Sequence, residues 1–167
     1  VTGLEADGQL FRQHGVGDLL AAVEALPERG VVLLPNSKNV ILAAEQAAAQ
    51  SEKDVRVIPT RSLQSGLGAL VAFEGQSPLE ANVEAMEEAA GAVRSGSVAR
   101  ASRKAKIGEV DVEEGEFLGL VEGEPVASGD VLEPVAMEVL TRLVGDGADV
   151  LTVLVGDGAV ESDAVVE

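Results

Sequence analysis

The fold of this chain is decided by the stretch VVLLPNSKNVILAAEQ at residues 31–46. Four consecutive apolar residues, ended by a proline, predict a strand buried on both faces, and an Ala- and Leu-rich segment with helical spacing follows at once. Asn36, Ser37 and Asn39 are all suitable N-caps for that helix. The stretch therefore predicts a strand, a tight polar turn and a helix. The first N–H groups of the helix and the Lys38 ammonium should converge beyond the carboxyl end of the strand.

The same construction recurs in VRVIPTRSLQSGLGALVAF at residues 55–73. A short strand again ends at a proline, a polar turn with a cation follows, and a glycine-containing helical run completes the unit. This order predicts a parallel sheet, and a right-handed crossover would place both turns at the same edge. Two cations beside helix N-termini favour an anionic ligand there. The candidate ligand-binding residues are Asn36, Lys38, Asn39, Thr60, Arg61, Gln64 and Gly66.

The composition of the 167 residues bounds the classes of function. An apolar content of 46% and a positive mean hydropathy predict a folded chain. Lys and Arg number 12 against 29 Asp and Glu, and the net charge of -17 argues against nucleic acid and anionic membranes as partners. There is no cysteine for a disulfide or a Cys-type zinc site, and no apolar run of about 20 residues that would span a bilayer. We expect a cytoplasmic protein.

The pattern as a whole predicts an α/β protein with two lobes. The first, residues 1–75, is a parallel-sheet lobe with flanking helices. Two helices are expected before the strand that begins at residue 31. One spans residues 4–14, and the other is capped by Asp18 and ends near Leu26. The boundary falls in the Gly- and Pro-containing segment 74–78.

The second lobe, residues 76–167, is expected to be smaller and mixed α+β. Ser77 as N-cap, with Glu80 three residues on, predicts a capping box that opens its first helix. The elements expected are a helix at 78–94, an alternating strand at 97–107, a hairpin of 117–121 with 125–128, a helix at 131–144 capped by Asp130, a strand at 150–155 and a short edge strand at 160–167.

Five of the 12 cations gather in and around the alternating strand, and an acidic run follows at 109–116. The two segments can be neighbouring strands joined by ion pairs, each worth roughly 0.2–1 kcal/mol. Alternatively, the basic strand faces an acidic partner protein. In that second interpretation the candidate partner-binding residues are Arg94, Arg100, Arg103, Lys104 and Lys106.

No catalytic signature is present in the sequence. It contains no Walker loop, no Gly-x-Ser-x-Gly elbow, no His-Glu-x-x-His and no dinucleotide fingerprint. The single histidine, His14, has no obvious Asp partner in sequence and is predicted to be a surface or cap residue. The Val-Gly-Asp-Gly repeats at 144–147 and 155–158 are better explained by turns than by calcium or phosphate binding. We therefore predict no catalytic and no metal-binding residue.

Several stretches together resemble one bacterial family over nearly the whole chain, in order. They are LPNSKNVILAAEQAA at 34–48, VIPTRSLQSGLGAL at 57–70, LEANVEAM at 79–86, SGSV at 95–98, GEFLGLV at 115–121 and LTVLVG at 151–156. These stretches resemble the C-terminal region of the fatty-acid kinase A subunit. That family is also known as DAK phosphatase, is related to dihydroxyacetone kinase and is associated with DegV-type proteins.

The resemblance implies a role in a phosphorylation system. In that family a helical domain upstream carries the ATP and magnesium chemistry, and a small DegV-type protein holds a fatty acid whose carboxylate is phosphorylated to acyl phosphate. The C-terminal region is implicated in docking that DegV-type partner. The resemblance therefore implies a docking role, with no cofactor in this part of the chain and no catalysis by this part alone.

Two other interpretations come from different classes. One is a dihydroxyacetone kinase-like domain that binds a small phosphorylated or carboxylated ligand at the strand ends. Covalent capture of dihydroxyacetone in the related substrate-binding protein uses a histidine, and His14 alone could serve here. The other is a homodimer formed through the β-rich lobe.

Overall fold

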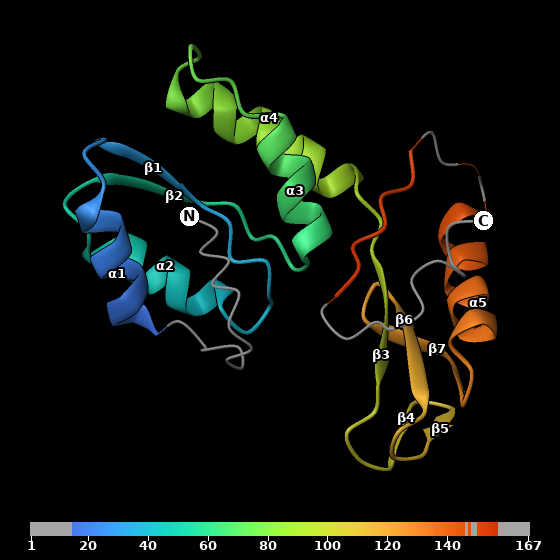
Figure 1. Cartoon of the computed structure of the whole chain (residues 1–167). Helices are drawn as coiled ribbons and strands as arrows, with labels where there is room; N and C mark the ends of the chain where they lie inside the picture. The colour runs from blue at the N-terminus through green and yellow to red at the C-terminus, as the bar shows by residue number, and fades with distance from the viewer. Residues whose placement is uncertain (1–14, 146, 148–149, 157–167) are drawn as a thin grey trace. The chain divides into compact units, whose positions relative to one another are not determined.

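The protein has a mixed α/β structure. The computed structural model describes residues 15–145, 147 and 150–156 (Figure 1). It divides into two compact units, Val1–Val93 and Arg94–Glu167. The helix expected at 4–14 and the edge strand expected at 160–167 lie outside the described residues.

The first unit is built from two successive strand–helix pairs. Its elements are α1 (Val16–Ala25), β1 (Gly30–Leu33), α2 (Ile41–Gln50), β2 (Asp54–Val57), α3 (Leu63–Val71) and α4 (Leu79–Ala92). Strands β1 and β2 pair in parallel, with Val31 opposite Val55 and Leu33 opposite Val57. The parallel pair predicted from the two proline-ended strands is therefore confirmed.

The core of the first unit lies where α3 and α4 pack together. Ile58, Ala69 and Met86 are buried there, and Val32 and Leu34 pack against them. On α2, Ala44 and Ala47 are also buried, because small side chains let a helix lie close to its neighbours. Apolar residues of both predicted strand–helix units therefore contribute to the interior of this part of the chain.

Helix caps in this unit differ from the sequence prediction. Helix α2 has Val40 as its N-cap and no side-chain cap, because residues 37–40 form a turn in which the Val40 N–H donates to the Ser37 carbonyl. Helix α1 begins at Val16, so Asp18 lies inside the first turn and accepts from the Gly15 N–H at 3.2 Å.

The capping box expected at the start of α4 is also wrong. Pro78 is the N-cap of α4, with no side-chain cap. The Glu80 carboxylate pairs instead with the Arg56 guanidinium of β2 at 3.0 Å. An ion pair between elements has replaced a local hydrogen bond to the backbone. The hydrogen bond and charge of Asp54, and after them the charge of Glu80, raise the pKa of Arg56.

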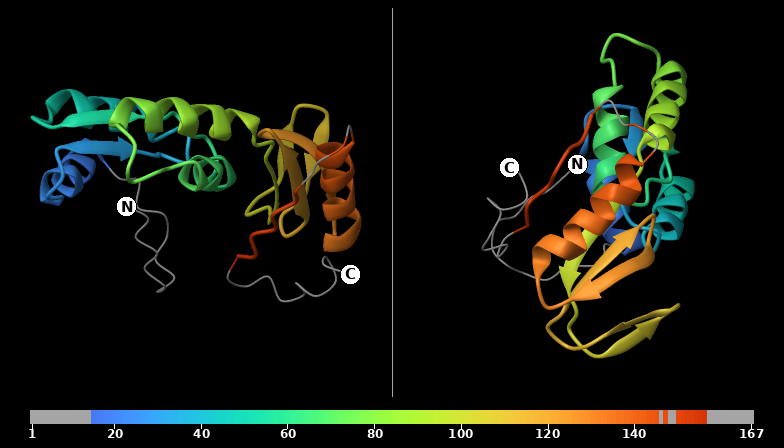
Figure 2. Two further views of the ribbon diagram at one scale, coloured as in Figure 1. Left: turned by 90° about the horizontal axis from the view of Figure 1, so that it is seen from above. Right: turned by 90° about the vertical axis from the view of Figure 1, so that its right-hand side faces the viewer.

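The second unit is a small antiparallel sheet covered by a helix. Its elements are β3 (Gly96–Arg100), β4 (Ala105–Ile107), β5 (Val110–Val112), β6 (Phe117–Val121), β7 (Glu124–Gly129) and α5 (Leu132–Val144). The strand order is β3-β6-β7, and β4 and β5 form a separate hairpin. Figure 2 shows α5 lying across one face of the three-stranded sheet. Gly96 and Gly119 allow that approach, because a Cβ at either position would lie 2.7 Å from a Val139 methyl.

The hairpin of β6 and β7 is confirmed. Its two turn residues, Glu122 and Gly123, both have positive φ, as a type I′ turn requires. Helix α5 is confirmed as well, but its N-cap is Val131 rather than Asp130, and it has no side-chain cap.

Three other predictions for the second half differ from the structure. The strand expected at 97–107 is two strands, β3 and β4, separated by residues 101–104. The apolar run 150–155 is in no strand and is exposed along its whole length. The division between units falls at Val93 rather than at residue 75, because α4 packs against α3.

Candidate ligand and docking sites

Three of the candidate ligand-binding residues meet at the carboxyl ends of β1 and β2. The Asn36 N–H donates to Thr60 Oγ1 at 3.0 Å, and the Thr60 hydroxyl donates to Asn36 Oδ1 at 2.9 Å. Thr60 is 2% exposed, and Asn36 has the left-handed φ of 56°. Gly66 lies directly against the Asn36 amide, since a Cβ there would be 1.9 Å from Oδ1. The predicted proximity of the two turns is correct, and this trio holds them together.

The other four candidates lie around this trio. Lys38, Asn39 and Arg61 are exposed on the two turns, and Gln64 is half-buried in the first turn of α3. The Asn39 N–H donates to the Ser37 hydroxyl. The structure does not test whether any of these residues binds a ligand, so that role stays a prediction.

The N-terminus of α3 is capped by its own side chains. Ser62 Oγ accepts from the Ser65 N–H at 3.1 Å, and Ser65 Oγ accepts from the Ser62 N–H at 3.2 Å. This reciprocal pair is a capping box that the sequence analysis did not predict. Its signal was the Ser-x-x-Ser spacing ahead of an apolar helical run.

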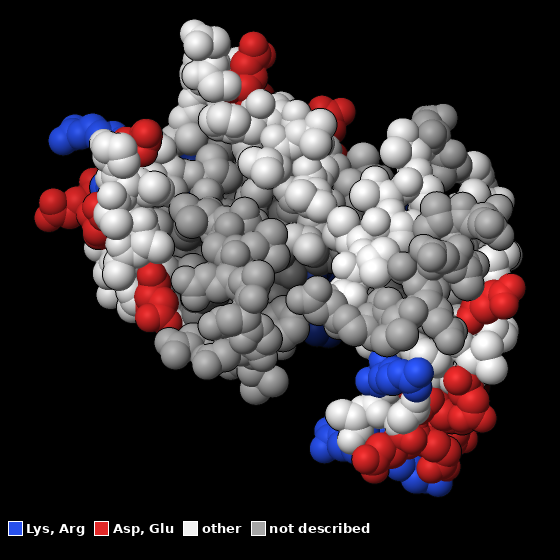
Figure 3. All heavy atoms as spheres, viewed as in Figure 1, with Lys and Arg blue, Asp and Glu red and all other residues white. Residues whose placement is uncertain are grey.

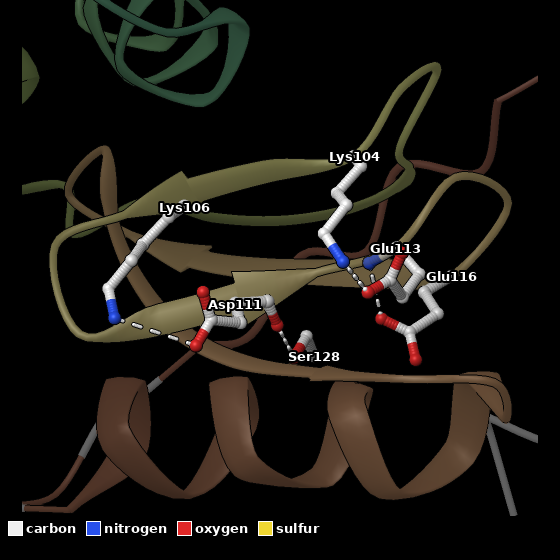
Figure 4. Close-up of polar contacts among 6 residues, drawn as sticks. All are labelled: Lys104, Lys106, Asp111, Glu113, Glu116 and Ser128. Atoms are coloured by element: carbon white, nitrogen blue, oxygen red, sulfur yellow. Dashed lines mark hydrogen bonds and ion pairs between the residues drawn. The ribbon is translucent and has the colours of Figure 1, made fainter.

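Two of the candidate partner-binding cations are paired within the β4–β5 hairpin. Lys104 Nζ lies 2.5 Å from Glu113 Oε1, and Lys106 Nζ lies 3.6 Å from Asp111 Oδ2 (Figure 4). The hydrogen bond to Glu113 raises the pKa of Lys104. Figure 3 accordingly shows acidic and basic side chains intermixed over this hairpin.

Two further cations of that set contact neighbours in the second unit. The Arg100 guanidinium lies 4.1 Å from the centroid of the Phe117 ring and donates to the Gly115 carbonyl. Arg94 donates to the carbonyls of Arg142 and Leu143, where the last turn of α5 leaves acceptors unpaired. Arg103 is exposed and has no ion pair among the described residues. These contacts favour the neighbouring-strand interpretation over the basic docking strand.

An apolar stripe on α3 was not singled out from the sequence. Leu63, Leu67, Leu70 and Val71 are 46, 37, 53 and 88% exposed and lie at helical spacing on one side of the helix. Buried Ala69 lies on its other side, and buried Gly66 lies at the edge of the stripe beside Leu70. The signal was available, because beyond Gln64 and Ser65 in its first turn α3 has no polar side chain, and a helix that is apolar all round normally has neighbours on all sides. We call these four exposed residues the α3 stripe.

Metal and membrane chemistry can be assessed for the described part of the chain. Within residues 15–145, 147 and 150–156, no three His, Cys, Asp or Glu side chains are grouped so as to hold a metal ion. In the same residues no helix is long and apolar enough to cross a bilayer. His14 lies outside the described residues.

The chain belongs to the family described as fatty acid kinase A-subunit-like, C-terminal, whose match covers residues 7–166. An uncharacterized protein of Staphylococcus saprophyticus is 38% identical over 143 residues, which cover 79% of this chain and 26% of that protein. Uncharacterized proteins of Staphylococcus epidermidis and Staphylococcus aureus are 36% identical over 158 residues and 33% identical over 143 residues. These cover 87% and 79% of this chain, and 28% and 26% of those proteins. The chain thus spans about a quarter of the length of the curated relatives it matches.

Proposed function

We propose that this chain docks the fatty-acid-binding partner of a fatty-acid kinase-like protein. In this proposal a DegV-type partner holds the fatty acid and presents its carboxylate for ATP-dependent conversion to acyl phosphate. ATP and magnesium would be bound by domains outside this chain. Membership of the C-terminal family named above supports the proposal.

The observation that carries the proposal is the α3 stripe. Large apolar side chains in contact with water are characteristic of protein interaction sites when they adjoin one another on a surface. The conspicuous polar residues nearby, Asn36 and Thr60, satisfy each other and serve the architecture. A recognition role therefore suits this geometry better than a chemical one.

The test is a calorimetric titration of this chain with the fatty-acid-loaded DegV-type protein from the same organism. Saturable binding with a negative heat-capacity change is expected, because apolar surface is buried on binding. The same partner without fatty acid shows whether the cargo matters. Absence of binding by both forms of the partner would contradict the docking function.

A second function is favoured by one observation, the trio at the ends of β1 and β2. It fixes two turns at one sheet edge, each carrying an exposed cation, Lys38 or Arg61. In open α/β sheets this edge is where ligands bind. The chain would then bind a small phosphorylated or carboxylated molecule, as a dihydroxyacetone kinase-like domain does.

Titration with inorganic phosphate and with acetate tests this second function. The double variant Lys38→Ala/Arg61→Ala should keep the fold, since exposed turn substitutions cost within about 0.5 kcal/mol. Heat that the wild type gives and the double variant lacks would support a ligand site. Equal or absent heats would leave the docking function as the single proposal.

A further inference from the structure

The α3 stripe continues onto α4. A Cβ at Gly68 would lie 2.6 Å from a Val93 methyl and 3.4 Å from the Ala89 carbonyl, so the two helices approach closely. On α4 the exposed residues Ala81, Ala85 and Ala92 recur at helical spacing on one side, and exposed Glu88 lies among them on the same side. On a helical projection these alanines lie next to the part of α4 that contacts Gly68 of α3. They lie away from the side of α4 on which Asn82 and Met86 are buried. The two helices therefore present one surface, formed by large apolar side chains on α3 and by small alanines with Glu88 on α4.

The connection between the two helices is held in place by a buried side chain. Asn82 is 3% exposed. Its amide accepts from the Glu74 N–H at 2.7 Å and donates to the carbonyls of Glu74 and Ser77 at 2.8 and 3.2 Å. The loop is thereby fixed, and it begins with Phe73, whose ring is half exposed next to the end of α3. A fixed loop loses little entropy on binding, which suits a recognition surface.

We call this surface the α3–α4 face. It consists of the α3 stripe with Phe73, Ala81, Ala85 and Ala92.

The charged residues of α3, α4 and the loop between them are all acidic, and Arg61 and Arg94 directly precede and follow this segment. Residues 62–93 contain five Glu and no Lys or Arg. Glu80 is paired with Arg56, whereas the other four, Glu74, Glu84, Glu87 and Glu88, are exposed and in no ion pair among the described residues. Charge complementarity therefore specifies the occupant, a surface with an apolar centre bordered by Lys or Arg.

We propose that the α3–α4 face binds a protein partner whose contact surface is apolar and bordered by Lys and Arg. This partner is the fatty-acid-binding protein, so the inference rests on the proposed docking function. The apolar centre supplies the affinity, and the glutamates speed the encounter. The β4–β5 hairpin and the exposed residues of α5 take no part in the contact.

Three matched double variants test the proposal by surface-plasmon or calorimetric binding to the fatty-acid-loaded partner. Leu67→Ser/Val71→Ser should weaken affinity tenfold or more, mainly through faster dissociation. Glu84→Lys/Glu88→Lys should slow association several-fold and reduce its dependence on salt. The control, Val131→Ser/Met137→Ser, changes two residues of the second unit that are 58 and 55% exposed, and should leave binding unchanged. Circular dichroism and thermal unfolding confirm that each variant is folded.

The outcomes separate this inference from the docking function. If wild type binds the partner and Leu67→Ser/Val71→Ser binds equally well, the α3–α4 face is not the contact, although the docking function stands. If the wild-type protein does not bind the partner, both the docking function and the contact through the α3–α4 face are contradicted. Sedimentation of the free protein then identifies a second copy as the occupant if a dimer dissociates in Leu67→Ser/Val71→Ser. Binding that strengthens with salt would contradict the basic border of the partner.

Discussion

The α3–α4 face and the β4–β5 hairpin are both exposed, but they differ in which side chains remain available to contact a partner protein. In the hairpin, Lys104 and Lys106 lie opposite Glu113 and Asp111, so these charges form ion pairs within the unit. The α3–α4 face carries leucines in contact with water, and four of the five glutamates of residues 62–93 are in no ion pair among the described residues. A cluster of charge in the sequence is therefore a weaker sign of a binding surface than an apolar helix face that the fold leaves uncovered.

In the first unit, too, polar residues that look available in the sequence are paired with each other in the structure. Asn36 and Thr60 lie where a ligand would be expected, yet each satisfies the other. If these internal pairs serve stability and the α3–α4 face serves binding, substitutions at the two places should have separate effects.

The largest effect is expected for Gly66→Ala. The added Cβ would lie 1.9 Å from Asn36 Oδ1, an atom that the Thr60 hydroxyl holds in place. The turn must shift or α3 must move away, at a cost of about 3 kcal/mol in the free energy of unfolding. Urea denaturation followed by circular dichroism measures this loss.

Gly91→Ala is the matched control on α4. A Cβ there meets nothing within 4 Å, so alanine should raise the helix's stability by up to about 1 kcal/mol. Equal effects of the two substitutions would show that Gly66 is not a close-approach position.

A smaller loss, about 2 kcal/mol, is expected for Thr60→Val. The isosteric change deletes one hydroxyl and leaves the Asn36 N–H and Oδ1 without their partner. Thr60→Ser keeps the hydroxyl and should recover most of the loss. The same urea experiment applies, and partner affinity should be almost unchanged in both variants. A Thr60→Val protein of wild-type stability would show that the hydrogen bonds of the Asn36–Thr60–Gly66 trio do not stabilise the fold.

The smallest effect is expected for Lys104→Gln in the hairpin. Exposed ion pairs contribute little and are screened by salt, so unfolding midpoints should differ slightly at low salt and converge at high salt. The pKa of Lys104 is raised in the folded state by Glu113, so its contribution is present at neutral pH and is lost as the pH rises through that raised value. Partner affinity should not change. A large loss of affinity in this variant would show that the β4–β5 hairpin, and not the α3–α4 face alone, contacts the partner.

Much of the first unit could be predicted from the sequence, because its information is local. Two apolar runs ended by prolines, each followed by a helical pattern, were enough to predict β1, α2, β2 and α3 and the parallel pairing of the strands. The meeting of Asn36 with Thr60 followed from that topology. The hairpin of β6 and β7 was predictable for the same reason, since its turn contains glycine between two apolar runs.

Features decided by tertiary neighbours could not be predicted in this way. Glu80 had the spacing of a capping box, but its carboxylate pairs with Arg56 of β2, which is distant in sequence. The run at 150–155 has the composition of a buried strand, yet the described sheets contain no strand beside it. Lys104 and Lys106 looked available in the sequence, and the cross-strand pairing that occupies them depends on the register of β4 with β5.

The measurement that tests the central claim most directly is hydrogen exchange of this chain with and without the fatty-acid-loaded partner. Amides can be followed in α3 and α4 and in the β4–β5 hairpin within one experiment. The account predicts slower exchange over residues 63–92 in the complex and unchanged exchange over residues 104–113. New protection confined to the hairpin, with α3 and α4 unchanged, would contradict it.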